Sequence, residues 1–201
     1  MNLNGASLKD FPVICLGGAT VEIDAYTELI RDLPVDLGAA IVVINHLKAV
    51  GSRLLESLVI SAKVPVEVIT DRSLVQPNRV YVLNEGRDLH VVDGEFRLKP
   101  VSKPTGWTNV VTVFLGSLAK NWHGQLVAVI LSGLDGDGAE ALGQIKKVGG
   151  ITIAQKIDTH GDPNMPSNAI ASGNIDLILS LEDIAKQIIR IAHAGKAEIL
   201  R

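Results

Sequence analysis

The chain has 201 residues, enough for one domain with a sizeable buried core. Hydrophobic residues make up 47% of it and charged residues 20%, which excludes an intrinsically disordered chain. The formal net charge of -3 does not indicate nucleic-acid binding, and no apolar run reaches the roughly 20 residues of a membrane helix. One cysteine, Cys15, excludes an internal disulfide and favours a reducing, cytoplasmic location.

Short β-branched runs alternate with longer segments of helical periodicity along the chain. The predicted strands cover residues 11–16, 39–44, 64–70, 79–83, 89–92, 95–98, 126–131, 150–154 and 176–179. The predicted helices cover residues 23–33, 52–61, 108–121, 138–148 and 181–194. Several strands are apolar throughout, which is typical of parallel strands buried on both faces. This order predicts an α/β fold with a doubly wound, mostly parallel sheet and helices on both faces.

One segment, residues 77–104, interrupts the alternation of strands and helices. It contains two strand patterns separated by Asp93-Gly94, which is a hairpin turn sequence. We therefore expect a small antiparallel ribbon in addition to the main sheet. No linker or repeat divides the chain, so residues 1–201 are expected to form a single domain.

Ligands of doubly wound sheets bind at the carboxyl ends of the strands, and three predicted strands end in unusual residues. These strand ends are residues 17–20, 45–46 and 132–138. His46 can act as a general base there, and the alternative is a histidine that is only hydrogen-bonded within a loop. Asp137, which lies between two glycines, can orient a histidine, cap the following helix or remain a solvated turn residue.

The first strand end resembles the tight turn that exposes a catalytic nucleophile, yet the residue at the turn is Ala19. Thr20 carries a hydroxyl one position further on, and the favoured role for it is the N-cap of the next helix. Ser132 is a candidate nucleophile, although a hydroxyl bonded to the strand-end backbone is the favoured interpretation. Cys15 is interpreted as a small buried hydrophobic residue.

Metal and cofactor sites are not expected. Asp158, His160 and Asp162 have side chains that ligate metals, but a solvated polar loop is the favoured interpretation. Residues 135–138 begin like a calcium loop but lack the later ligands. Residues 17–20 match neither a phosphate-binding loop nor a dinucleotide-binding fingerprint.

Several short motifs occur in an order that is specific when they are taken together. They are Gly17–Thr20, Val42–His46, Pro77–Leu83, Gly86–His90, Val129–Gly133, Asp137–Ala139, Gly149–Gln155, Met165–Pro166 and Ala169–Gly173. Over nearly its whole length the chain resembles the catalytic domain of CheB-type protein-glutamate methylesterases of bacterial chemotaxis. The resemblance implies a Ser-His-Asp hydrolase that demethylates glutamate methyl esters and deamidates certain glutamines on chemoreceptors.

The motifs also imply roles for individual residues. His46 matches the general base of the family and Asp137 the acid that orients it. The nucleophilic serine of the family falls at Ala19, and Thr20 matches a threonine common after that serine. Leu134 takes the place of a methionine near the oxyanion site.

Further implied residues and departures from the family pattern bear on activity. Gly18 and Met165 are expected in the vicinity of the oxyanion and the substrate. Ala19 removes the nucleophile, and Val21 and Glu22 stand where the family has two glycines. About ten residues precede the first strand, so the receiver domain of the family is not expected, and the chain is either free-standing or part of a larger fusion.

Three hypotheses follow. The favoured one is a CheB-type domain with degenerate chemistry that binds a methyl-accepting chemoreceptor or a related signalling protein without cleaving it. The second is an active hydrolase that uses Thr20, or a water activated by His46 and Asp137. The third is an unrelated small-ligand binding module on the same edge of the sheet.

Overall fold

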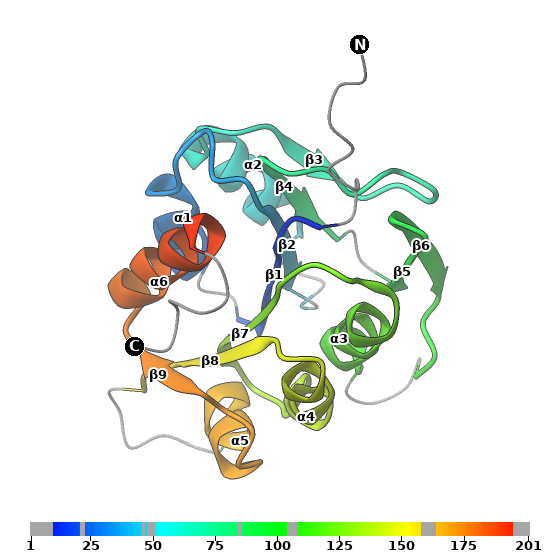
Figure 1. Cartoon of the computed structure of the whole chain (residues 1–201), viewed down its shortest axis with the longest axis vertical. Coiled ribbons are helices and arrows are strands. Elements are labelled where there is room, and N and C mark those ends of the chain that lie inside the picture. The colour runs from blue at the N-terminus through cyan, green and yellow to red at the C-terminus, as the bar shows by residue number, and fades with distance from the viewer. Residues whose placement is uncertain are drawn as a thin grey trace.

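A computed structural model describes residues 10–20, 23–45, 47, 51–83, 86–103, 108–157 and 164–194. Seven strands form one sheet in the order β3-β4-β2-β1-β7-β8-β9, and each neighbouring pair is parallel (Figure 1). The strands are β1 (Val13–Ala19), β2 (Ala40–Asn45), β3 (Val66–Val68), β4 (Arg79–Val82), β7 (Leu126–Gly133), β8 (Ile151–Gln155) and β9 (Leu177–Leu179). The predicted doubly wound, parallel α/β fold is confirmed.

Helices cover both faces of the sheet (Figure 1). They are α1 (Asp24–Arg31), α2 (Gly51–Ser61), α3 (Val110–Asn121), α4 (Ala139–Lys147), α5 (Met165–Ala171) and α6 (Leu181–His193). Buried side chains of α1, α2 and α6 share one hydrophobic cluster, whereas those of α3, α4 and α5 share the other. The two clusters lie on opposite faces of the sheet.

The central strand β1 shows why the sequence lacks polar alternation. Its side chains alternate between the two hydrophobic clusters, with Val13 and Cys15 in one and Ile14 and Leu16 in the other. All four are at most 1% exposed. A strand covered by helices on both faces must be apolar at every position, which the sequence pattern indicated.

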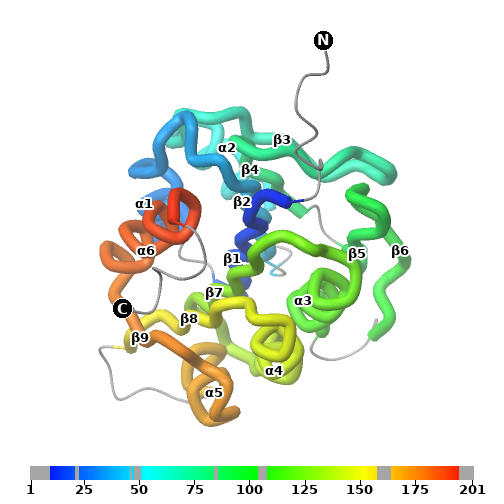
Figure 2. The backbone as a smooth tube through the Cα atoms, viewed as in Figure 1, coloured from blue at the N-terminus to red at the C-terminus, as the bar shows by residue number. Residues whose placement is uncertain are grey.

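The order in which the chain adds strands to the sheet reverses direction at β1. This can be followed in Figure 2 along the tube from blue to green. The chain passes from β1 through α1 to β2 on one side, and later through α3 to β7 on the other side of β1. Because α1 and α3 cover opposite faces, the carboxyl ends of β1 and β7 flank the point of reversal. Ligand sites of this fold class lie at such a point.

The expected antiparallel ribbon is present and consists of β5 (Arg87–Val92) and β6 (Glu95–Pro100). Asp93 and Gly94 join the strands with φ angles of 56° and 82°, the positive values that a tight two-residue hairpin requires. The ribbon packs beside α3, where the Ser117 hydroxyl accepts the N–H of Val91 at 2.9 Å.

The helix α5 was not predicted from the sequence. Asn164 caps it by accepting the N–H of Ser167 through Oδ1 at 3.0 Å, and Pro166 lies in the first turn. An Asn cap followed by Pro is a helix-start pattern, so the pattern was available in the sequence. The helix has only seven residues, too few to show a clear apolar periodicity.

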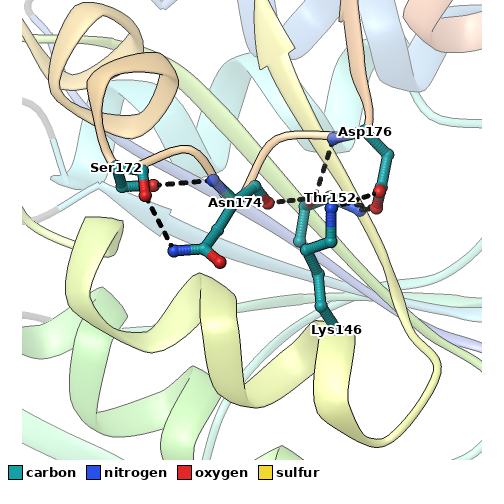
Figure 3. A network of polar contacts seen from close by, with 5 residues as sticks. All are labelled: Lys146, Thr152, Ser172, Asn174 and Asp176. Atoms are coloured by element: carbon teal, nitrogen blue, oxygen red, sulfur yellow. Dashed lines mark hydrogen bonds and ion pairs between the residues drawn. The ribbon is translucent and has the colours of Figure 1, made fainter.

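A buried polar network joins α4 to β8 and to the segment before β9 (Figure 3). Thr152 is fully buried, and its hydroxyl lies 2.6 Å from Asn174 O and 2.9 Å from Asp176 Oδ2. The backbone N–H of Asp176 donates to the Thr152 hydroxyl at 3.0 Å, and Lys146 pairs with Asp176 at 2.7 Å. These bonds satisfy the polar groups that the edge of the sheet would otherwise bury without partners.

Candidate active site

The carboxyl ends of β1 and β7 meet at a cavity of about 270 Å³. Its described lining is Ala19, Thr20, Leu47, Ser132, Gly133, Leu134 and Asn164. A shift of register after Gly17 places Ala19 directly opposite Gly133. The structure thus brings the predicted position of the nucleophile to the cavity, at the point where the winding reverses.

Two glycines allow the ends of β1 and β7 to approach closely. A Cβ atom at Gly18 would collide with the Tyr26 hydroxyl, and one at Gly133 would collide with the Met165 sulfur. The same Cβ at Gly133 would lie 2.8 Å from the backbone N of Ala19. Met165 is fully buried beneath Gly133, so it supports the wall of the cavity and is not part of the described lining.

Ala19 is the last residue of β1 and is fully shielded from solvent at the inner end of the cavity. Its methyl group can neither attack a carbonyl carbon nor exchange a proton with a base. Leu134, in contrast, is 70% exposed at the mouth of the cavity. The cavity therefore has one exposed apolar side chain at its mouth, and it has no nucleophile at position 19.

The favoured role of Thr20 as a helix N-cap is wrong. The N-cap of α1 is Ile23, and no side chain caps this helix. The helix begins three residues later than an N-cap at Thr20 requires, since its first residue is Asp24. Thr20 instead lines the cavity, and its carbonyl accepts the side-chain amide of Asn45 at 2.8 Å.

Asn45 connects the ends of β1 and β2. In addition to its bond to Thr20, it accepts the N–H of Leu47 through Oδ1 at 3.1 Å. It therefore fixes the backbone on both sides of position 46 relative to β1. His46 itself lies outside the described residues, as do Val21 and Glu22.

Asp137 is 5% exposed in the turn between β7 and α4, and it binds the first turn of α3. Its Oδ2 accepts the N–H of Val111 at 2.8 Å, and its Oδ1 accepts the N–H of Thr112 at 2.9 Å. The Thr112 hydroxyl in return accepts the N–H of Gly138 at 2.8 Å. Asp137 is therefore neither a solvated turn residue nor the cap of α4, whose N-cap Gly138 has no side-chain cap.

Gly138 permits this arrangement because its φ angle is +93°, a conformation that side chains disfavour. The backbone N–H of Asp137 also donates to the side chain of Asp135, at Oδ1, over 3.0 Å. The turn is thus held by side-chain and backbone bonds that leave the Asp137 carboxylate in a fixed position. A fixed carboxylate at this edge suits the role of orienting a histidine.

Ser132 is half-buried in the cavity wall and is bonded to Gln155 at the end of β8. Its hydroxyl donates to Gln155 Oε1 at 3.1 Å, and its backbone N–H donates to the same oxygen at 3.0 Å. The sequence pattern favoured a Ser132 hydroxyl that is hydrogen-bonded to the strand-end backbone. The structure shows a hydrogen-bonded hydroxyl, but its acceptor is the side chain of Gln155. Gln155 and Asn164 were both overlooked as site residues. Gln155 is a polar residue at the end of a buried strand, and Asn164 begins an Asn-x-Pro helix start, so the sequence marks both positions.

Cys15 is buried inside β1, as predicted. Burial raises the pKa of its thiol, and the nearby Asp137 carboxylate raises it further, so the thiol stays protonated and unreactive.

Among the residues that the structure describes, no three His, Cys, Asp or Glu side chains gather as metal ligands would. The candidate metal residues Asp158, His160 and Asp162 lie outside that set. In the same set, no helix is long and apolar enough to cross a membrane.

Comparisons with known proteins agree with this architecture. A protein-glutamate methylesterase/protein-glutamine glutaminase of Rhizobium meliloti is 30% identical over 194 residues, covering 92% of this chain and 53% of that protein. One from Burkholderia lata is 34% identical over 182 residues, covering 88% of this chain and 53% of that protein. The chain therefore spans about half the length of the curated relatives it matches.

A solved structure shows the same arrangement. The CheB methylesterase catalytic domain of Thermotoga maritima superimposes with a TM-score of 0.80 at 25% identity, covering 90% of this chain and 98% of that one. Residues 14–188 match the family described as CheB methylesterase. Since this match covers most of the 201 residues, the chain belongs to the CheB methylesterase family.

Proposed function

We propose that the chain is a single CheB-type domain that binds a side chain of a chemoreceptor, or of a related signalling protein, in the cavity and hydrolyses it very slowly or not at all. The observation that carries the proposal is Ala19, a methyl group at the inner end of the cavity where the resemblance implies a serine. A reducing, cytoplasmic location, supported by the single buried thiol of Cys15, belongs to the same proposal.

The chemistry of the lining favours an uncharged side chain. The described lining residues are apolar or neutral, and none of them carries a charge. A carboxylate placed there would lose its hydration without gaining a cation among these residues, which is costly. A glutamate methyl ester or a glutamine carboxamide would lose much less, in agreement with the substrates implied by the family.

The missing hydroxyl decides how fast such a group can react. Removing the serine of a Ser-His-Asp triad lowers kcat by roughly 10⁶-fold, because no covalent intermediate can form. What remains is the weak acceleration from binding and from hydrogen bonds to the developing oxyanion. We therefore expect the domain to retain binding while it loses turnover.

A binding experiment tests this proposal. A fluorescent peptide that carries one glutamate methyl ester is titrated with the chain, beside the same peptide with a free glutamate. The ester peptide should bind more tightly. Leu134→Asp should weaken this binding at the mouth of the cavity, whereas Val35→Asp, at a 61% exposed position before β2, should not. Equal affinity for both peptides would contradict the proposal, and so would equal loss in both variants.

The second candidate is an active hydrolase, and the placement of Thr20 in the cavity wall favours it over a purely structural role for that residue. In this case Thr20→Val would abolish methanol release from a methylated receptor while leaving binding of the ester peptide intact. If the unaltered chain releases no methanol, this candidate is excluded.

A further inference from the structure

Ser132 lies in an irregular part of the cavity wall. Gly17 of β1 pairs with Ile130 of β7. Two residues later on β1, Ala19 pairs with Gly133, which lies three residues later on β7. Strand β7 therefore holds one extra residue here, which is a β-bulge, a feature that redirects side chains and is frequent beside active sites. Ser132 is within this bulge, is half-buried and lines the cavity.

The neighbours of Ser132 fix the orientation of the Gln155 side chain. Ser132 lies beyond the last pair of the β7–β8 ladder, which is Ile130 with Ala154. Its backbone N–H donates to Gln155 Oε1 at 3.0 Å. The reverse orientation of the Gln155 amide would place an N–H2 group against this N–H, so the atom that faces Ser132 must be the carbonyl oxygen.

This orientation decides what the Ser132 hydroxyl can do in the cavity. Its Oγ lies 3.1 Å from the same Gln155 Oε1, and a carbonyl oxygen can only accept a hydrogen bond. The Ser132 hydroxyl must therefore donate its proton to Gln155. Only the lone pairs of Oγ remain for a group bound in the cavity, so Ser132 is an acceptor toward a ligand.

Asn164, which also lines the cavity, has the opposite polarity. Its Oδ1 accepts the N–H of Ser167 at 3.0 Å, as the cap of α5. That bond fixes the orientation of the amide and leaves Nδ2, which can only donate, as the group of this side chain that can bind a ligand. Ser132 and Asn164 therefore offer the cavity one acceptor and one donor.

A primary carboxamide matches both groups. Its carbonyl oxygen accepts from Asn164, and its N–H2 group donates to Ser132. A methyl ester offers the same carbonyl oxygen but has no N–H or O–H for Ser132. To bond an ester oxygen, the Ser132 hydroxyl would have to withdraw its proton from Gln155, so one hydrogen bond would be lost for the one gained.

We propose that Ser132, with its proton held by Gln155, is a specificity-determining residue that makes the cavity bind a glutamine side chain more tightly than a glutamate methyl ester. The inference rests on the proposed function, because it states which of two neutral side chains the cavity prefers. It concerns binding alone, so it does not depend on a nucleophile at position 19.

The test compares three labelled peptides that differ at one residue, which is glutamine, glutamate methyl ester or glutamate. The ratio of the ester Kd to the glutamine Kd is measured for each protein. Because both values come from the same protein, a general loss of stability does not imitate a change in this ratio. The unaltered chain by itself already tests the preference.

Two pairs of variants test the assigned roles. Ser132→Ala removes the acceptor, and its matched control is Ser61→Ala, at a half-buried serine that ends α2 and does not line the cavity. Gln155→Leu removes the oxygen that holds the Ser132 proton, whereas Gln155→Glu keeps an oxygen acceptor at that place.

We expect the unaltered chain to bind the glutamine peptide roughly two- to tenfold more tightly than the ester peptide, as one additional neutral hydrogen bond would give. Ser61→Ala and Gln155→Glu should keep this ratio. In Ser132→Ala and Gln155→Leu it should fall to about one, because the first lacks the acceptor and the second leaves the hydroxyl able to donate to the ester.

The outcomes separate this inference from the proposed function. Equal affinity of the unaltered chain for the glutamine and ester peptides would overturn the role of Ser132, and so would a ratio that Ser132→Ala leaves unchanged. The proposed function would stand in both cases if the two neutral peptides still bind more tightly than the glutamate peptide. If neither does, both proposals are wrong.

Discussion

Substitution of Asp137 by alanine should loosen the start of α3. The carboxylate accepts two backbone N–H groups of that helix, from Val111 and Thr112, and it is nearly buried. Hydrogen bonds to a charged group contribute roughly 1.5–3 kcal/mol each, and an anion at a helix N-terminus adds up to about 1 kcal/mol. Because water can reach part of the vacated space, we expect a loss near the lower end of this range, about 3 kcal/mol.

Urea unfolding followed by far-UV circular dichroism measures this loss. A chain of this size has an m-value of about 2–3 kcal/mol per molar urea, so the midpoint should fall by roughly 1–1.5 M. Glu28→Ala, on the exposed face of α1, is the matched control and should shift the midpoint very little. If Asp137→Ala unfolds at the same urea concentration as the unaltered chain, the carboxylate does not hold α3.

Three further predictions concern the strand ends and the buried network. Gly133→Ala should lower the free energy of unfolding by about 1–3 kcal/mol, because the new Cβ collides with Met165 and Ala19, and the thermal midpoint should fall clearly. Gly38→Ala is the control: its φ angle is unfavourable for alanine, at +77°, but the space around it is open, so it measures the cost of backbone strain without a collision. Thr152→Val should cost about 1–3 kcal/mol because the valine leaves Asn174 O and the Asp176 N–H without their partner; an unchanged urea midpoint would contradict this. The pKa of Asp176 is lowered, because the bonds from Lys146 and Thr152 outweigh the opposing effect of burial. Its contribution to stability is therefore fully present above the ordinary aspartate pKa of 3.8, which applies to the unfolded chain, and is lost as pH falls through the lower folded value. Lys146→Met should reduce this acid-dependent part of the stability, and identical pH profiles for the two proteins would count against the assignment.

The fold could be predicted from the sequence because its main features are local or periodic. The apolar runs of β1, β2 and β7 indicated buried parallel strands, and Asp93-Gly94 indicated the hairpin. The short helix α5 escaped because seven residues give little periodicity, and only its cap and Pro166 mark it.

The position of the site could be predicted from the sequence, but the hydrogen-bond partners of its residues could not. Strand ends that carry Ala19 and Ser132 pointed to the correct edge of the sheet. The role of Asp137 could not be read from the sequence, since its partners Val111 and Thr112 lie 26 and 25 residues away. Helix capping is usually local, so Thr20 was predicted to cap the helix that follows it, and a cap of the following helix was one of the alternatives for Asp137; neither residue caps that helix.

The structural role of Asp137 also bears on the interpretation of the site. A carboxylate that anchors α3 has a structural role whether or not the domain is catalytic, so the presence of Asp137 does not by itself indicate an active enzyme. The fold therefore does not require a hydroxyl at position 19.

The most direct test of the account is methanol release from a methylated chemoreceptor by the unaltered chain and by the Ala19→Ser variant under the same conditions. The account predicts no detectable release by the unaltered chain, and a gain of activity in the variant if the rest of the site is competent. Release by the unaltered chain that disappears in His46→Ala would contradict the account, because the chain would then be an enzyme that works without the serine.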